Sequence, residues 1–456
     1  MTSALTAIVS MLIVLGIMVL VHEFGHFLVA KWCGVRVEVF SIGFPPRLFG
    51  FRRGDTDYRI SLLPLGGYVK MAGGEPGDPC TGDPGELTSR PRWQRILISL
   101  AGPGANFVLA FLLMAGLYMT HNQVPNYLAG AAVTDVIPHD SAAWKAGIRP
   151  GDKILDFASR KNPNWEQIED QTIANANANV PITIERTVDG RQQIIQTSLF
   201  LANPKHSDTF EIEDLGVLPR MQDTPLGVRD VISGDPAAKA GLKAGDKIVS
   251  INGQSVYSVQ AVSAWLQQSD GKPVTLDILR GSKLLTITVK PTWADNGAGA
   301  MGYRLGFYTT QPPYHIEHLS LPKAMKSSLK SNIRYSGLIL EMLRRMVSKP
   351  SNVKEISGPI GIAHATGMAV SMGWKPLIDL MAGISLNLGI LNLLPFPILD
   401  GGTIMFLLVE SMLRRDLNQD FKERMYQVAF VVIVLFFVFV MVNDVAKLNI
   451  LPKLRL

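Results

Sequence analysis

The sequence predicts a polytopic α-helical membrane protein with about four transmembrane helices, two α+β modules inserted between the second and third of them, and a membrane-associated β-hairpin. Three observations support this fold class. Hydrophobic residues make up 47% of the 456 residues, whereas charged residues make up only 18%. Apolar stretches near spanning length lie towards both ends of the chain, and the more polar middle contains an internal repeat.

The candidate transmembrane helices are residues 5–30, 96–119, 377–394 and 428–442. A cleaved signal peptide is the alternative for the first of them, but no Lys or Arg precedes it and its apolar run is too long. The third is interrupted by the polar residues Ser385, Asn387 and Asn392. Polar side chains at membrane depth are costly, so this span is expected to carry function.

The distribution of charge orients these spans. Lys and Arg are concentrated after the first span and between the last two, so both of these loops are predicted to face the cytoplasm. The N-terminus, the long middle segment and the C-terminus then lie outside. The formal net charge of +6 fits membrane orientation and anionic headgroups, and we expect a lipid bilayer and no nucleic acid among the partners.

The middle segment repeats itself. Residues 137–155 are echoed by residues 232–249, and both copies contain an Ala-Gly pair followed by Gly-Asp-Lys-Ile. This pattern resembles the PDZ domain of bacterial membrane and envelope proteases, most closely in the second copy, which continues into Ser250-Ile251-Asn252-Gly253. PDZ domains bind an extended peptide or a C-terminus at a sheet edge. A purely structural role is the alternative for these modules.

Two further segments are expected to lie at the membrane. Residues 58–71 read as two strand-like runs around Gly66-Gly67, a hairpin that would either pair with an extended substrate or simply pack over the spans. Residues 319–348 combine apolar positions at helical spacing with Lys and Arg, which predicts an amphipathic helix on the membrane surface. The alternative for this helix is packing on the second module in solvent.

The chemistry is indicated by His22-Glu23-Phe24-Gly25-His26, an H-E-x-x-H motif inside the first span. Histidines four residues apart share one helix face, so both imidazoles can reach one zinc ion, with the glutamate beside them as general base. Two histidines leave such a site incomplete, because a catalytic zinc usually takes three protein ligands.

Asp400 is the candidate for the missing ligand. It lies at the inner end of the third span, the same membrane face towards which the first span carries His22 and His26. The alternative is a helix cap or loop turn before Gly401-Gly402, and for Asp400 taken alone this alternative is preferred.

The two motifs together, H-E-x-x-H and the Asn392-x-x-Pro395-x-Pro397-x-Leu-Asp-Gly run, resemble the two-part signature of the site-2 protease family of intramembrane zinc metalloproteases. The resemblance extends over nearly the whole chain. It implies the following roles: His22, His26 and Asp400 as ligands of Zn²⁺, Glu23 as catalytic base, and Asn392, Pro395 and Pro397 as substrate contacts.

The resemblance also implies a location and substrates. The expected place is a bacterial inner membrane, with both termini and the PDZ domains on the periplasmic side and the hairpin loop and active-site opening towards the cytoplasm. Expected substrates are single-pass membrane proteins, such as a pre-trimmed anti-sigma factor, and signal-peptide remnants. The expected division is residues 1–122 (two spans), 123–220 (first PDZ domain), 221–310 (second PDZ domain), 311–373 (amphipathic linker) and 374–456 (two spans).

Two other functions are weighed against proteolysis. An inactive membrane adaptor that presents two PDZ domains would keep the repeat but has no need of Glu23 and Asp400 beside two histidines. A zinc transporter would use the same ligands but predicts polar residues along a path through several spans, and the second and fourth spans offer few.

Overall fold

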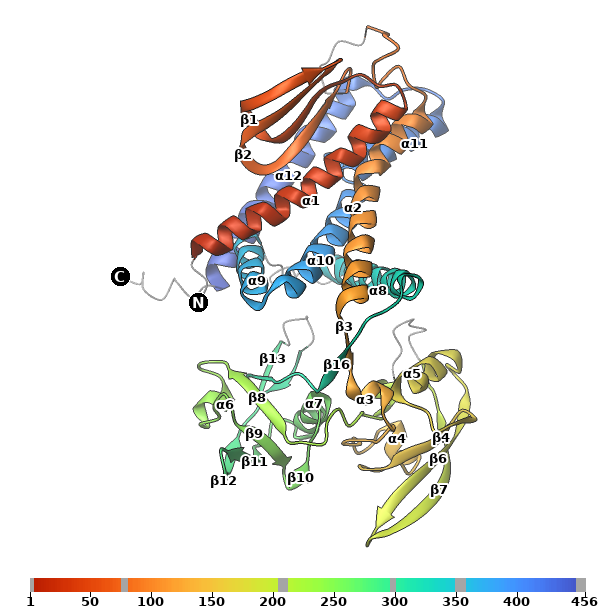
Figure 1. The fold of residues 1–456 in the computed structure, drawn as a ribbon, viewed down its shortest axis with the longest axis vertical. Helices are drawn as coiled ribbons and strands as arrows, with labels where there is room; N and C mark the ends of the chain where they lie inside the picture. The colour runs from red at the N-terminus through yellow and green to blue at the C-terminus, as the bar shows by residue number, and fades with distance from the viewer. Residues whose placement is uncertain (1–3, 75–80, 204–211, 296–300, 349–357, 448–456) are drawn as a thin grey trace, which may run out of the picture. The chain divides into compact units, whose positions relative to one another are not determined.

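A computed structural model describes residues 4–74, 81–203, 212–295, 301–348 and 358–447. The chain divides into two compact units, which are described separately (Figure 1). The first, the membrane unit, combines Met1–Asn122 with Glu317–Leu456. The second, the module unit, is Gln123–Ile316 and holds most of the strands.

Three helices of the described chain are long and apolar enough to cross a membrane. They are α1 (Ala4–Trp32), α2 (Arg92–His121) and α12 (Gln419–Lys447), which correspond to the first, second and fourth predicted spans. The third predicted span coincides with α10 (Trp374–Asn392), which is 19 residues long but carries Asp379, Asn387 and Asn392 and does not reach the same hydropathy. The total of four spans therefore stays a prediction.

Helix α10 packs along α2 through small residues. The Ser385 hydroxyl donates a hydrogen bond of 2.9 Å to the backbone carbonyl of Asn106, and a Cβ on Gly389 would lie only 3.2 Å from the carbonyl oxygen of Pro103 and 3.3 Å from the ring of Phe107. A short turn then leads to α11 (Asp400–Leu413). Close contact between small residues is the usual way in which membrane helices associate.

The predicted amphipathic helix is present as α8 (Leu321–Ser348). It packs on α2 through small polar residues: the Ser328 hydroxyl donates to the carbonyl of Phe111 at 2.7 Å, and Asn332 is only 8% exposed. Ile339 and Leu343 also pack inward, whereas most of its other large apolar side chains are exposed, with Ile333 65% exposed. An outward apolar face next to basic residues suits contact with lipid rather than with water. Helix α9 (Pro359–Met372) completes the unit and contacts α1, α10 and α12.

The predicted hairpin is β-structure, but its turn is not at Gly66-Gly67. Strands β1 (Val37–Arg53) and β2 (Thr56–Met71) are joined at Gly54, where Arg53 pairs with Thr56. Residues 67–71 pair with residues 37–42 rather than with the neighbouring part of β2. The placement of the turn was wrong because the long first strand offers partners on both sides, which a reading of residues 58–71 alone misses.

The module unit contains two α+β folds. In the first, the sheet order is β5-β4-β6-β7 and the core surrounds Trp165 and Phe157. Helix α5 starts at a capping box between Asn164 and Gln167. The elements are α3 (Asn126–Ala129), α4 (Ala142–Lys145), β4 (Lys153–Phe157), β5 (Arg160–Lys161), α5 (Trp165–Ala174), β6 (Asn179–Val188), β7 (Arg191–Phe200) and η1 (Ile212–Leu215).

The second fold has the sheet order β12-β11-β9-β8-β15, with β10 on β9 and a separate β13-β14 pair. Its elements are β8 (Leu226–Val231), α6 (Pro236–Lys239), β9 (Lys247–Ile251), β10 (Gln254–Ser255), α7 (Val259–Gln268), β11 (Val274–Arg280), β12 (Lys283–Val289), β13 (Thr292–Asp295), β14 (Met301–Arg304) and β15 (Phe307–Thr309). Where the chain enters and leaves the unit, β3 (Asn122–Pro125) pairs with β16 (Tyr314–Glu317).

Equivalent contacts confirm the internal repeat. In the first copy the Arg186 guanidinium donates to both carboxylate oxygens of Asp152 and to the carbonyl of Gly147. In the second copy Arg280 makes the same three bonds to Asp246 and Gly241. Both ion pairs join residues 34 apart in the sequence. This pairing lowers the pKa of Asp246 below its ordinary value.

Candidate metal centre

The two histidines of the H-E-x-x-H motif lie on one buried face of α1. His22 is 6% exposed and His26 is 8% exposed, and their Nε2 atoms are 3.2 Å apart. The four-residue spacing of the sequence thus produces the shared face that was predicted. Phe24, between them, points the other way and is 46% exposed.

Asp400 faces the same two imidazoles. One carboxylate oxygen lies 3.1 Å from Nε2 of His22 and the other lies 3.3 Å from Nε2 of His26. Asp400 is the first residue of α11, directly after the turn that follows α10. The two glycines behind it permit this turn, because a Cβ on Gly401 or Gly402 would lie 2.2–2.3 Å from backbone oxygens of Leu393 and Phe396.

The spacing of these three groups is close to that of a tetrahedral zinc site. Two ligands that are each roughly 2 Å from a zinc ion in tetrahedral geometry lie about 3.3 Å apart. The two Nε2 atoms are 3.2 Å apart, and they lie 3.1 and 3.3 Å from different oxygens of Asp400. With one ligand atom from each residue, the three atoms lie within 4.8 Å of one another. Among the residues that the structure describes, His22, His26 and Asp400 form the one group of three or more such side chains able to hold a metal ion.

Helix α2 supports both imidazoles from behind. Nδ1 of His26 donates to the backbone carbonyl of Ile98 at 2.7 Å, and the side-chain amide of Asn106 lies 3.1 Å from Nδ1 of His22. Gly102 lies between these two positions on the same face of α2. A Cβ at Gly102 would lie 2.2 Å from Nε2 of His26, so only glycine allows α2 this close to α1.

A cavity of about 420 Å³ opens at the cluster. Glu23 lines it, and its carboxylate accepts a hydrogen bond from the backbone N–H of Val69 in β2. Asn392 also lines the cavity, with its amide nitrogen 3.4 Å from Nε2 of His22. Pro395 and Pro397 are not part of this lining. The remaining lining residues are Tyr68, Val69, Met71, Gly74, Leu87, Ile98, Ser99, Ile398, Leu399 and Thr403, with His22, His26 and Asp400.

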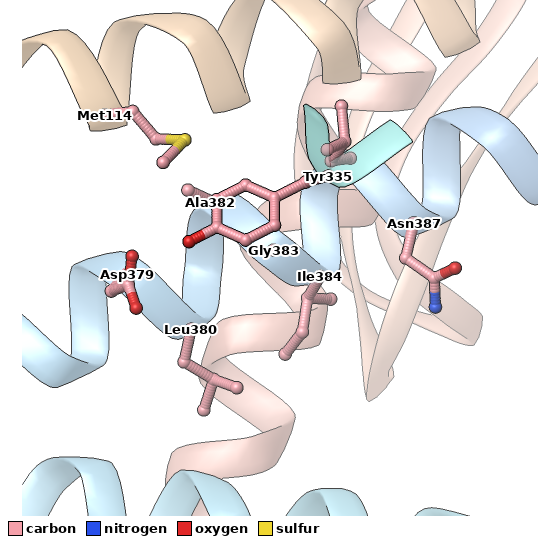
Figure 2. Close-up of a pocket in the computed structure, with 9 residues that line it drawn as sticks. Met114, Tyr335, Asp379, Leu380, Ala382, Gly383, Ile384 and Asn387 are labelled. Atoms are coloured by element: carbon pink, nitrogen blue, oxygen red, sulfur yellow. The ribbon is translucent and has the colours of Figure 1, made fainter. Parts of the chain in front are cut away.

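A second cavity of the membrane unit, of about 360 Å³, lies between α2, α8 and α10 (Figure 2). Figure 2 shows the ring of Tyr335 over α10, with its hydroxyl on the side of Asp379. Met114 and Asn387 also line this cavity, and it shares no lining residue with the first. Its lining has one carboxylate and neither histidine nor cysteine, so it does not offer a second metal centre.

The contribution of α2 was not predicted. The second span was expected to offer few polar residues, yet Asn106 is fully buried beside His22. One signal was available, because an asparagine inside an apolar span needs a polar partner. The backbone carbonyl of Ile98 and the steric role of Gly102 had no signal, since both depend on how closely two helices approach.

Apolar helices that bring two histidines, an aspartate and an adjacent glutamate to one cavity define a membrane protein with a metallohydrolase type of site. The comparison with known families agrees. The chain belongs to peptidase family M50, whose model matches residues 10–436.

Relatives match over almost their whole length. The regulator of sigma-E protease RseP from Salmonella typhimurium is 30% identical over 98% of this chain and 100% of its own. A putative zinc metalloprotease from Vibrio cholerae has the same identity and coverage. A solved PDZ domain of an SdrC-like protein from Listeria monocytogenes, at 26% identity and a TM-score of 0.17, covers 19% of this chain and 87% of that chain.

The chain is therefore a metalloprotease of the site-2 type, in a family of membrane proteins whose members include zinc metalloproteases and regulators of sigma-E.

Proposed function

We propose that this protein is an intramembrane zinc endopeptidase that hydrolyses peptide bonds within or near the transmembrane segment of single-pass membrane proteins. The observation that carries this proposal is the meeting of His22, His26 and Asp400, with Glu23 beside them, in one cavity of a unit built from apolar helices.

Each residue at the cavity has a proposed role. His22, His26 and Asp400 hold the zinc ion. When bound, zinc would polarise the scissile carbonyl and acidify a water molecule. Glu23 lines the same cavity, from which its carboxylate would accept a proton from the attacking water and donate it to the leaving amine. The amide of Asn392 reaches the same space and is proposed to donate a hydrogen bond to the substrate.

Strand β2 is proposed to hold the substrate in an extended form. A helical peptide bond is shielded by its own hydrogen bonds, so cleavage needs the segment to be unwound. Val69 of β2 contacts Glu23, and Tyr68 and Met71 line the cavity, so an edge of β-structure lies beside the catalytic base. Pairing of the substrate with a strand edge would satisfy its backbone groups. Pro395 and Pro397, in the turn between α10 and α11, are proposed to contact substrate from the other side.

The two modules are proposed to be PDZ domains that select substrates outside the membrane. We place the domain limits at residues 123–220 and 221–310, with the helical linker 311–373 leading back to the last spans. Both termini and the modules would face the periplasm of a bacterial inner membrane, and the β1-β2 sheet would associate with the membrane at the cytoplasmic side. Peptide or C-terminus binding by the modules follows from this assignment.

The substrate class is proposed from the family. Relatives are named regulators of sigma-E, which fits a pre-trimmed anti-sigma factor as substrate. Signal-peptide remnants are a second substrate of the same kind, because they too are single apolar segments with little attached outside the membrane.

The test is Glu23→Gln in the full chain, assayed in detergent with a single-pass reporter. We expect stoichiometric zinc with cleavage reduced at least about 100-fold, because the ligands remain and the proton acceptor is lost. Glu38→Gln, on β1 away from the cavity, is the matched control and should cleave normally. Undiminished cleavage by Glu23→Gln would exclude Glu23 as the base.

A catalytically inactive adaptor that presents the two modules is the second candidate. It is favoured only by the modules themselves and leaves the buried cluster of two histidines and a carboxylate without a purpose. The wild-type reporter assay separates the two candidates, since an adaptor would bind the reporter without cutting it.

A further inference from the structure

Both imidazoles of the cluster present Nε2 to Asp400 and Nδ1 to α2. Nδ1 of His26 meets the carbonyl of Ile98, which can only accept a hydrogen bond. The proton of His26 therefore sits on Nδ1, and Nε2 is left with a free electron pair. That is the tautomer a metal-binding imidazole needs, fixed by a backbone atom of the neighbouring helix.

His22 has no such carbonyl. Its Nδ1 meets the side-chain amide of Asn106 at 3.1 Å, from a residue two helical turns beyond Ile98 on the same face of α2. An amide offers either an acceptor or a donor, and the two forms differ by a half-turn of the side chain. If the NH₂ group faces Nδ1, the proton of His22 must sit on Nε2, and Nε2 cannot bind a metal ion.

The other half-turn gives the opposite result. With the Asn106 carbonyl oxygen facing it, Nδ1 carries the proton and Nε2 is free. When the NH₂ group faces Nδ1 of His22, the Asn106 oxygen is buried and has no hydrogen-bond partner. Either orientation therefore leaves one end of the amide unpaired. Only the turned orientation is compatible with Nε2 of His22 as a ligand.

We propose that Asn106 is a positioning residue that accepts the Nδ1 proton of His22 and so sets the tautomer and ring orientation in which His22 binds metal. This rests on the proposed zinc function and extends it to a residue outside the two signature motifs. Helix α2 would thus orient both imidazoles, one through a backbone carbonyl and one through an amide.

The surroundings hold Asn106 in place for this role. Its side chain is completely buried, and its own backbone carbonyl accepts a hydrogen bond of 2.9 Å from Ser385 of α10. The amide of Asn392 also approaches His22, but at 3.4 and 3.5 Å from the two ring nitrogens, so it does not distinguish them.

The test compares Asn106→Leu with Asn106→Asp in the full-length protein. Leucine keeps the volume but removes both hydrogen-bonding groups, whereas aspartate keeps an acceptor and removes the donor. Zinc affinity is measured by competition with a chelator of known affinity, and ligand geometry by the visible spectrum of the cobalt(II)-substituted protein. Asn332→Leu, which removes another buried amide facing α2, is the matched control.

We expect Asn106→Leu to bind zinc 10- to 100-fold more weakly, the usual effect of losing a hydrogen bond to a metal-binding imidazole. Asn106→Asp should stay within about threefold of the wild type or bind more tightly, because a carboxylate is the common partner of such an imidazole. The cobalt spectrum should change in the leucine variant alone, and Asn332→Leu should match the wild type.

Wild-type zinc affinity in Asn106→Leu would overturn the proposal, and so would equal losses in the leucine and aspartate variants, because a donor would then be required. If the leucine variant does not fold, Asn106→Ala serves as the second apolar variant under the same criteria. The proposed function fails separately, through absence of zinc binding or reporter cleavage in the wild-type protein.

Discussion

Asp400, at the start of α11, faces two imidazoles that belong to a different helix, α1. Each of its oxygens faces one Nε2 atom, at 3.1 and 3.3 Å, although 374 residues separate Asp400 from His26 in the sequence. The N-cap of α11 is Leu399, and Asp400 is the first residue of the helix itself, so Asp400 does not hold the capping position. The side chain is thus directed at the histidines rather than at its own helix.

Asp400→Ala should lose zinc, because two histidines seldom hold a catalytic zinc without a third ligand. We expect affinity to fall at least about 100-fold, measured as bound zinc after dialysis against a chelator. Asp379→Ala is the matched control, since this carboxylate lies in the other cavity. Stoichiometric zinc in Asp400→Ala would remove Asp400 from the ligand set.

Gly102→Ala should damage the site without changing any hydrogen-bonding group. The added methyl would lie 2.2 Å from His26, so α1 and α2 must separate. We expect a destabilisation of about 1–3 kcal/mol and weaker zinc binding, measured by thermal unfolding and by metal content. Gly104→Ala in the same helix meets nothing within 4 Å and should retain both properties. Equal behaviour of the two variants would disprove the close-approach role.

At the scale of single residues, the spacing of His22 and His26 was sufficient to predict their shared face. Asp400 became a candidate only through its place near the same membrane face, and its orientation needed coordinates. Asn106 was missed because its partner is in another helix, 84 residues away in the sequence. Local sequence patterns report contacts within one turn of a helix and not contacts between helices.

Among the helices, the first turn of α9 is capped by a carboxylate from another helix. The buried Asp444 of α12 accepts hydrogen bonds from the backbone N–H groups of Gly358, Ile360 and Gly361, at 2.9 to 3.1 Å. These N–H groups belong to the first turn of α9, where no side chain of the helix itself provides a cap. Asp444 therefore joins the beginning of α9 to the end of α12.

Asp444→Ala should loosen this junction. Three N–H groups, one buried and two partly buried, would lose their acceptor, at a cost of about 1–3 kcal/mol. The expected result is a lower midpoint of thermal unfolding and faster hydrogen exchange in α9. Asp420→Ala, an exposed acidic residue at the other end of α12, should leave both unchanged. Unaltered exchange in α9 of the Asp444 variant would show that the cap is dispensable.

Helices were easier to predict than the β1-β2 sheet. Long apolar runs predicted α1 and α2 to within a few residues. Helix α12 begins at Gln419, in a polar stretch before the predicted start at residue 428. The β-strands were recognised, but pairing was assigned to the nearest glycine turn. Strand partners are chosen by contacts over the whole sheet, and residues 37–42 compete successfully for residues 67–71.

At the scale of the module unit, Asp135 couples the two folds. It lies between Ala132 and Ile137 of the first core, yet its carboxylate accepts hydrogen bonds from the backbone N–H of Tyr257 and the hydroxyl of Ser258, at 3.0 and 2.8 Å. The adjacent Val136 is buried in the core of the second fold. Burial raises the pKa of Asp135 to about 6, against the opposing effect of these hydrogen bonds.

This raised pKa predicts that the second fold becomes less stable as the pH rises from about 4 to about 6. In that window the unfolded chain has released the Asp135 proton and the folded chain still holds it, so rising pH favours unfolding. The full loss is about 3 kcal/mol and is complete above the folded pKa. Asp246 affects stability only below this window. Its pKa is lowered, so the stability that its pairing with Arg280 provides is lost only in more acidic solution.

Hydrogen exchange in β9 and β11, corrected for intrinsic rates, measures this effect in the full chain. Protection should decrease from pH 4 to pH 6 in the wild type and stay level in Asp135→Asn, which keeps acceptor oxygen but does not titrate there. Equal slopes in the two proteins would assign the pH dependence to another group.

Across the full chain, the apolar helices, the internal repeat and the H-E-x-x-H face could be predicted from the sequence, because each follows from periodicity or self-similarity along the chain. The tertiary structure alone decided that Asp400 reaches His22 and His26, that Asn106 and Ile98 support them, and that β2 borders the cavity beside Glu23. The two sets of features differ because patterns along the chain act within one element, whereas the site depends on contacts between elements. A periodic pattern fixes which side of an element is buried, but contact between elements depends on close packing of small residues, such as Gly102, and on turns set by backbone clearance, as at Gly401 and Gly402.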